Sequence, residues 1–286
     1  MALIGTLTSG VSALSTFSKG LEVIGNNIAN VNTTGFKSSN ASFEQSFANT
    51  LRGSTPSSGS TSDTSAIQIG AGVQVAGIAQ DFSQGALNST GNTTDLGISG
   101  NGFFIVKDAA SSTQYATRDG QFKVDSNGYL TTQLGMRVQG LTGAGLKTVG
   151  DVRIGASLPT GAALQSVSID NSGNVVEYYS DGTNATTNQI QLQNFNDPSA
   201  LMQTGGNLYT ELTNAGPVGG GILTGGNVPD TNGLGKVKSG TLEQSNVDLA
   251  QQFSDLITTQ RSFQAGSRLI TVSDTVLDDV VNLKRS

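Results

Sequence analysis

The sequence predicts an α+β fold: long N- and C-terminal helices pair as a coiled-coil-like core, and an antiparallel β-rich domain lies between them in the chain. The helices are predicted by apolar residues that recur at seven-residue spacing near both ends. The middle domain is predicted by short runs rich in Val, Ile, Phe, Tyr and Thr, separated by Gly, Asn and Asp turns. We therefore expect the chain to leave a helical pair, build a β domain and return.

The N-terminal apolar stripe predicts a helix of about 25 residues. Its main row repeats every seven residues: Leu7, Leu14, Leu21 and Ile28. A companion row consists of Leu3, Phe17 and Ile24. Gly10 interrupts the stripe. Because a helix with one apolar face cannot bury that face alone, the pattern indicates a partner helix.

The C-terminal stripe predicts a longer helix of about 38 residues, roughly 57 Å at 1.5 Å per residue. Its main row also repeats every seven residues: Leu249, Leu256, Phe263, Ile270 and Leu277. Further apolar positions flank this row: Phe253, Leu269, Val276 and Leu283. The segment Ser245–Asp248 fits a capping-box start, in which the Ser245 hydroxyl accepts a hydrogen bond from an exposed N–H of the first turn.

The change of pattern along the chain predicts three regions. They are a terminal helical core (1–31 with 246–286), an extended linker region (32–66 with 225–245) and a β-rich outer domain (67–224). Within the linker, Arg52–Ser65 is rich in Gly, Ser and Thr and has little to bury, which is typical of extended or disordered chain. Within the β domain, an Asn-Gly pair predicts a hairpin over 121–130, and a similar turn predicts another over 168–176.

The composition excludes several classes of function. The 286 residues include no His, Cys or Trp, so the commonest metal ligands, a catalytic thiol and a Ser-His-Asp relay are absent. The formal net charge is -6 and only 13% of the residues are charged, which argues against binding to nucleic acid or to an anionic membrane surface. No apolar stretch reaches the roughly 18 residues that suggest a membrane-spanning helix. The N-terminus also lacks the basic start of a secretory signal.

The turn-rich segments do not complete a binding motif. Gly70-Ala71-Gly72 lacks the third glycine and the following helix of a dinucleotide loop. Asp170–Asn174 has alternate oxygen ligands, but Val175 stands where a calcium loop needs glycine. We therefore predict no catalytic, cofactor-binding or metal-binding residues, no cofactor and no small-molecule ligand, and a protein that is not an enzyme.

The apolar rows instead indicate self-assembly. A helix pair buries one seam and leaves further rows that neighbouring copies could cover, so the termini would become fully ordered on assembly. The expected assembly interface consists of Leu7, Leu14, Leu21, Ile24, Ile28, Leu249, Phe253, Leu256, Phe263, Ile270, Val276 and Leu277. Two alternatives stay open: an ordinary helical hairpin inside a globular monomer, and a secreted β-rich adhesin oligomerised by its helices.

Seven sequence motifs are spread collinearly over nearly the whole chain. They are Leu21–Lys37, Asp81–Gly85, Thr94–Val106, Thr117–Phe122, Ser245–Leu249, Thr259–Gln264 and Val280–Arg285. Together they resemble the axial proteins of the bacterial flagellum, the rod and hook family. The motif positions in and beside the terminal helices are Asn26, Asn27, Ala29, Asn30, Gly35, Phe36, Gln260 and Arg261.

The resemblance implies a subunit of a tubular polymer. Its terminal helices would form an inner tube around an export channel, and its β domains would form an outer layer. The closing segment and Asp81-Phe82-Ser83 are most similar to the hook branch, which implies the hook that transmits motor torque to the filament. The distal rod of the basal body is the alternative, because the Arg52–Ser65 run is similar to the segment that stiffens it.

The same resemblance implies partners and a location. The implied partners are its own copies, neighbouring axial proteins of the rod, the hook–filament junction and the hook cap, and the flagellar type III export apparatus. Nucleic acid is not among them. The implied location is the flagellar hook or basal body, reached by export without a cleaved signal peptide.

Overall fold

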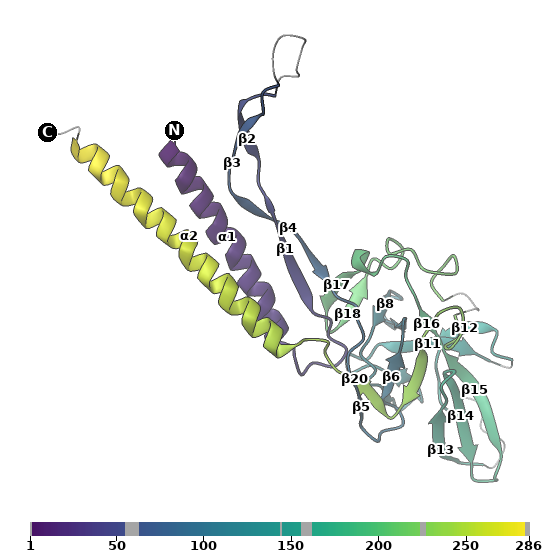
Figure 1. The fold of residues 1–286 in the computed structure, drawn as a ribbon. Coiled ribbons are helices and arrows are strands. Elements are labelled where there is room, and N and C mark those ends of the chain that lie inside the picture. Colours follow the sequence, from purple (N-terminus) through teal and green to yellow (C-terminus); the bar gives the residue numbers. More distant parts are fainter. Residues whose placement is uncertain (1, 55–62, 144, 156–161, 224–226, 284–286) are drawn as a thin grey trace. The chain divides into compact units, whose positions relative to one another are not determined.

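The computed structural model describes residues 2–54, 63–143, 145–155, 162–223 and 227–283 (Figure 1). The chain forms two compact units. Unit 1 consists of the residues up to Ala29, of Ser39–Asp81 and of the residues from Val247 onwards; unit 2 consists of Asn30–Ser38 and Phe82–Asn246. Helices lie in unit 1 and most strands in unit 2, so the predicted α+β class is confirmed. Eight residues of the Arg52–Ser65 run, 55–62, lie outside the described residues.

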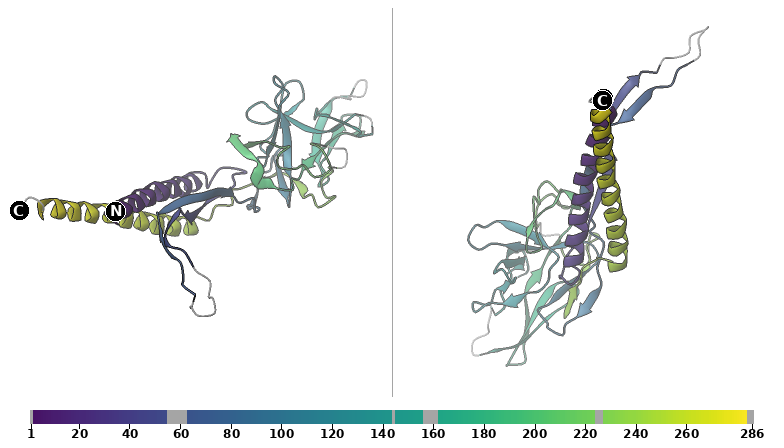
Figure 2. Two further views of the ribbon diagram at one scale, coloured as in Figure 1. Left: turned by 90° about the horizontal axis from the view of Figure 1, so that it is seen from above. Right: turned by 90° about the vertical axis from the view of Figure 1, so that its left-hand side faces the viewer.

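Two helices form the framework of unit 1. They are α1, Ala2–Ala29, and α2, Leu249–Leu283. The helices run antiparallel, because Thr6 hydrogen bonds to Ser273 near one end of the pair (3.2 Å between the hydroxyl oxygens) and Asn27 to Gln252 near the other (3.0 Å). Figures 1 and 2 show α1 and α2 side by side from three directions. The last turns of α2 extend beyond the first turn of α1.

The N-terminal cap of α2 differs from the prediction. Asp248, rather than Ser245, caps the helix: its Oδ1 accepts hydrogen bonds from the N–H groups of Ala250 (2.9 Å) and Gln251 (3.3 Å). Both residues satisfy the pattern of a small polar residue before an apolar stripe, but the carboxylate is the stronger acceptor for the positive end of the helix dipole. The helix therefore begins one turn later than the predicted capping box.

A long two-stranded arm completes unit 1. Its first part pairs β1, Ser39–Gln45, with β4, Val73–Gln80, in antiparallel register. Its second part pairs β2, Ala48–Arg52, with β3, Ile67–Gly70. Much of the region expected as a linker over 32–66 is thus strand. In β1, Ala41 and Phe43 alternate with polar residues, which is the pattern of a strand. The pattern is weak because Phe43 is the one large apolar residue of β1.

Unit 2 is built on an antiparallel sheet of twelve strands. Its main path runs β13-β14-β15-β11-β7-β8-β18-β17. In chain order the sheet strands are β7 Phe103–Lys107, β8 Gln114–Thr117, β9 Lys123–Val124, β10 Leu130–Thr131, β11 Arg137–Thr142, β12 Thr148–Asp151, β13 Leu164–Ile169, β14 Asn174–Tyr179, β15 Asn184–Ile190, β16 Leu192–Gln193, β17 Met202–Gly205 and β18 Leu208–Thr210. Outside it, β5 (Leu87–Ser89) pairs with β20 (Thr241–Glu243), and β6 (Leu96–Ser99) pairs with β19 (Lys236–Ser239). A short 3₁₀ turn, η1, covers Pro198–Ala200.

Both predicted hairpins are present. Strands β9 and β10 pair across the turn that contains Gly128, whose φ is +85°. Strands β13 and β14 pair across the turn that contains Gly173, whose φ is +76°. In each turn glycine takes the left-handed backbone that other residues rarely adopt.

The core of unit 2 lies on the two faces of β7. Alternate residues of this strand, Phe104 and Val106, join one buried cluster, and Phe103 and Ile105 join another. Because side chains of a strand point alternately to opposite faces, β7 is covered on both sides and reads as a continuous apolar run. The Phe103 ring makes edge contacts with Phe82 and Tyr209.

Substitution of Gly35 would test the close approach of its backbone to other backbone atoms of unit 2. Its φ is +66°, and a Cβ there would lie 2.7 Å from the backbone nitrogen of Asp119. Gly135 has a similar φ of +82° but open space around it. We expect Gly135→Ala to cost the strain of left-handed backbone, about 1–2 kcal/mol. Gly35→Ala adds an overlap with backbone atoms, for a total of about 3–4 kcal/mol.

The measurement is urea unfolding of each variant, followed by circular dichroism. The free energy of unfolding should fall more for Gly35→Ala than for Gly135→Ala. Equal losses in the two variants would contradict the close approach at Gly35.

Candidate assembly surface

The seam between α1 and α2 is closest at small and polar residues. Three residues of α2 are buried at multiples of a seven-residue spacing: Gln252, Gly266 and Ser273. A Cβ on Gly266 would lie 3.5 Å from the Cβ of Ala13, and a Cβ on Gly10 would lie 2.8 Å from a side-chain carbon of Ile270. The helices therefore approach closely where a side chain is missing. Gly10, which interrupts the predicted stripe, is a packing position that the apolar pattern did not reveal.

Most of the predicted interface residues flank this close line and are half-buried within one copy. On α2 they are Leu256, Phe263, Ile270 and Leu277. On α1 they are Leu7, Leu14, Leu21, Ile24 and Ile28. Leu14 shows the arrangement, since a Cβ on Gly266 would lie 3.6 Å from its Cδ2. Packing between the two helices thus covers these side chains only in part.

The remaining predicted residues are exposed: Leu249, Phe253 and Val276. Further apolar side chains of α2 are also exposed, and five follow one another at spacings of three and four residues: Leu269, Val272, Val276, Val280 and Leu283. We call these five the outer row of α2. They lie on one face of the helix. Val272 is 61% exposed and Leu283 75% exposed. Contiguous exposed apolar surface of this kind is typical of interaction sites.

The arm covers another side of α1. The rings of Phe17 and Phe43 make an edge contact with centroids 5.7 Å apart. The Thr16 hydroxyl donates to the carbonyl oxygen of Val73 in β4 (3.0 Å). Gly20 leaves room for the Phe43 ring, because a Cβ there would lie 3.0 Å from the ring. The helix is therefore held between α2 and the arm.

Asn27, a motif residue, joins three elements of unit 1 and is 1% exposed. Its Nδ2 donates to the carbonyl oxygen of Ser39 (2.8 Å) and to Oε1 of Gln252 (3.0 Å). Its Oδ1 accepts from the Ser39 N–H (3.0 Å). A buried amide with these hydrogen bonds fixes the end of α1 against β1 and α2, because an unpaired buried amide is costly.

The other motif residues occupy varied positions. Those exposed on the helices are Asn26, Ala29, Gln260 and Arg261. Asn30 is half-buried, and Gly35 and Phe36 are buried in unit 2. The exposed motif residues are available to a neighbouring molecule, whereas Asn27, Gly35 and Phe36 serve the fold of one copy.

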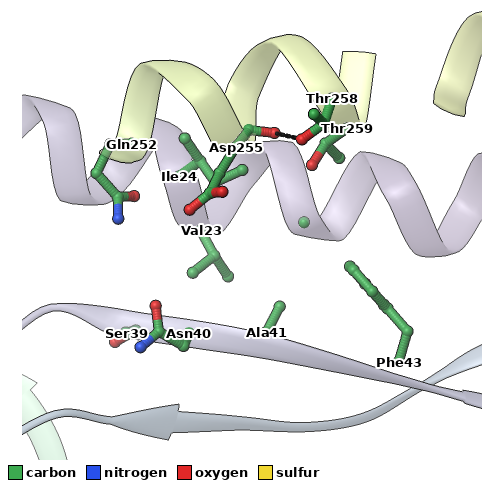
Figure 3. A pocket seen from close by; sticks show the side chains of 11 residues that line it. Val23, Ile24, Ser39, Asn40, Ala41, Phe43, Gln252, Asp255, Thr258 and Thr259 are labelled. Atoms are coloured by element: carbon green, nitrogen blue, oxygen red, sulfur yellow. Dashed lines mark hydrogen bonds between the residues drawn. The ribbon is translucent and has the colours of Figure 1, made fainter. Parts of the chain in front are cut away.

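A groove of about 270 Å³ lies among α1, β1 and α2 (Figure 3). Val23, Ile24 and Phe43 supply apolar walls, and the polar side comes from Asp255 and the threonines of α2. The Asp255 Oδ1 accepts from the Gln251 amide (3.0 Å). Of the described lining residues, Asp255 alone is titratable. The lining therefore combines one carboxylate with hydroxyl and apolar groups.

Other kinds of site were sought in the same residues. Among the described ranges, no group of three or more His, Cys, Asp or Glu side chains could hold a metal ion. Neither α1 nor α2, as far as they are described, has the length and apolar content needed to cross a membrane.

Three segments match known protein families. Residues 7–37 match the family described as flagella basal body rod protein. Residues 97–177 match the family described as flagellar hook protein FlgE/F/G D1 domain. Residues 238–283 match the family described as flagellar basal body rod FlgEFG protein C-terminal. The first and third families match terminal segments of the chain, and the second matches part of unit 2.

Relatives that align with nearly the whole chain are also named as flagellar rod or hook proteins. The flagellar basal-body rod protein FlgG of Bacillus subtilis is 38% identical over 283 residues, covering 99% of this chain and all of the relative. The FlgG rod protein of Borreliella burgdorferi is 33% identical, with 100% and 99% covered. The flagellar hook protein FlgE of the same organism is 26% identical over an alignment of 451 residues, with 99% and 100% covered. The chain therefore belongs to the family of bacterial flagellar rod and hook proteins.

Proposed function

We propose that the chain is a structural subunit of the flagellar rod, which polymerises with its own copies. The observation that carries the proposal is the end-to-end correspondence in length with relatives named as rod proteins. Alignment with the hook relative takes 451 residues, so that protein has segments with no counterpart in this chain of 286. The similarity of the Arg52–Ser65 run to the stiffening segment of the distal rod supports the same assignment.

The hook is the second candidate. The closing segment Val280–Arg285 and the Asp81-Phe82-Ser83 motif favour it, because both are most similar to hook proteins. In either position the subunit would meet other axial proteins at the two ends of its own stack. For the rod these are further rod proteins and the hook; for the hook they include the hook cap and the hook–filament junction. Delivery through the flagellar type III export apparatus belongs to both proposals.

Assembly would draw on the apolar surface that one copy cannot cover. The outer row of α2 and Phe253 are exposed in the single copy. Burying a large apolar side chain contributes about 1.5–3 kcal/mol, so a contact that covers several of these residues offsets part of the entropy lost on association. The contact needs no particular partner charge, which fits a chain with only 13% charged residues.

Labelling would test the place of the subunit in the flagellum. An epitope tag can be inserted at Gly182, which lies in an exposed turn with open space around it and a φ of +82°. We expect gold-labelled antibody to mark the rod in electron micrographs of isolated hook–basal bodies. A label on the hook would select the second candidate. A label on neither structure, with the tagged copy produced and exported, would overturn the axial role.

Charge substitutions in the outer row would test the assembly surface. We expect Val272→Asp together with Val276→Asp to abolish polymerisation, because a charge placed in an apolar contact costs several kcal/mol. The helix pair should survive, since both side chains are exposed in one copy. Thr271→Asp together with Thr275→Asp is the matched control, because it adds the same two charges at the same spacing on a different, exposed side of α2.

The measurements are sedimentation and electron microscopy for polymers, and circular dichroism for helix content. Phe263→Asp provides a contrast: Phe263 is half-buried on the seam side, so this change should lower the helix content as well. Polymers that form normally from the Val272/Val276 double variant would refute the role of the outer row.

A further inference from the structure

Three segments that connect unit 2 to unit 1 are bonded to one another inside unit 2. The chain passes between the units at Ala29/Asn30, Ser38/Ser39, Asp81/Phe82 and Asn246/Val247. The connecting segments are therefore 30–38, which has a crossing at each end, and the start and the end of 82–246. Parts of all three belong to the family-like motifs: Gly35, Phe36 and Lys37, then Ser83 to Gly85, then Asn246.

Glu243 is the centre of this arrangement. The side chains of Glu243 and Lys37 are fully buried, and the Lys37 Nζ lies 2.6 Å from the Glu243 Oε1. The same oxygen accepts from the Gly85 N–H (2.9 Å), and the main-chain carbonyl of Glu243 accepts from the Gly35 N–H (2.8 Å). Lys37 also donates to the carbonyl oxygen of Ser83 (2.7 Å). One glutamate thus binds both other segments.

Asn246 repeats the connection a few residues later. Its Oδ1 accepts from the Ser38 N–H (2.8 Å). Its Nδ2 donates to the Ser83 hydroxyl (3.0 Å) and to the Ser83 carbonyl oxygen (3.3 Å). Between the two residues, the Gln244 N–H donates to the carbonyl oxygen of Ala86 (2.8 Å). Each segment is therefore bonded to both of the others.

Arg118 ties the arrangement to the main sheet. It follows β8, and its Nη1 lies 3.1 Å from the Glu243 Oε2. Its Nη2 donates to the carbonyl oxygen of Gly100 (3.1 Å), and its guanidinium lies 5.1 Å from the centroid of the Phe103 ring. Burial lowers the pKa of Arg118, and Glu243 opposes that change. We call Lys37, Ser83, Arg118, Glu243 and Asn246 the junction cluster.

The energetics of the cluster favour all-or-none behaviour. Two cations share one carboxylate out of contact with water, so opening either ion pair leaves a buried cation without its partner. The strand pairs that follow are short, β5 with β20 over three residues and β6 with β19 over four. These short strand pairs contribute few hydrogen bonds between the connecting segments. The cluster therefore supplies much of the interaction that holds the segments to one another.

We propose that the junction cluster is a mechanical latch: it makes the three connecting segments one cooperative unit, which opens as a whole rather than one segment at a time. In the polymer, force applied to one connection would then be shared by all three; this last step rests on the proposed function. The latch itself is a property of a single copy.

Hydrogen–deuterium exchange on single copies of this chain would test the cooperative unit. In Glu243→Gln we expect peptides that contain 35–38, 83–86 and 243–246 to lose protection together, by about tenfold or more. Peptides from β7 and β11 should be unchanged. Asp151→Asn is the matched control, because it breaks a partly exposed ion pair with Arg137 elsewhere in unit 2 (2.9 Å). Loss of protection in the substituted segment alone would overturn the proposal.

Asn246→Ala is a milder variant for the same exchange experiment, and it tests the proposal if Glu243→Gln does not fold. It removes hydrogen bonds to two segments without leaving a buried charge. The loss of protection should be smaller than in Glu243→Gln but shared by the same three segments. Retained protection of 35–38 and 83–86 in this variant would contradict the latch.

Single-molecule pulling on the two termini would test the mechanical part. Force then enters unit 2 through 30–38 and the end at Asn246. We expect unit 2 to unfold at a lower force in Asn246→Ala than in the unsubstituted chain and in Asp151→Asn. An unchanged release force would exclude a mechanical role. Both experiments use single copies, so their failure is distinguishable from a failure of polymerisation.

Discussion

The close approach of α1 and α2 at residues without large side chains is the constraint on which unit 1 depends. The helices come together because Gly10 leaves room for the Ile270 side chain and Gly266 leaves room for Ala13 and Leu14. A seam of this kind uses little apolar surface, so the large apolar residues of α2 are divided between its flank and the outer row. The same geometry that holds one copy together therefore leaves an apolar face for another molecule. A seam built from leucines alone would separate the helices and bury more of that face within the copy.

The terminal helices and the β hairpins could be predicted from sequence because their signals are local. Seven-residue repeats mark the helices, and the turn at Gly128 marks a hairpin within ten residues. The contacts of Gly10 could not be predicted in this way, since a missing side chain interrupts an apolar pattern and its partner Ile270 lies at the other end of the chain. The first half of the arm, β1 and β2, was missed for a different reason. Its strand β1 has only Phe43 as a large apolar residue, so alternation is nearly invisible.

The motif residues show the same limit at the candidate site. The resemblance selected Asn27 and Gly35 without assigning them a physical role. The structure gives Asn27 hydrogen bonds to Ser39 and Gln252, and it gives Gly35 a left-handed backbone close to Asp119. Glu243, the centre of the junction cluster, was not singled out at all. An isolated glutamate in a sequence carries no sign of burial, and its partner Lys37 is 206 residues away.

The junction cluster of unit 2 and the outer row of α2 use opposite kinds of interaction, and the difference suits the proposed subunit, which must be firm within itself and adaptable toward its neighbours. Buried charges such as Glu243 and Arg118 are directional, because each needs a partner at one position and is costly without it. The outer row of α2 is apolar, and apolar burial depends on area rather than on one geometry. In the proposed polymer a copy could therefore shift slightly against its neighbours along the helices at little cost, whereas the junction cluster cannot rearrange without leaving a buried charge unpaired. Small adjustments in a polymer of such subunits would be taken up at the helical contacts.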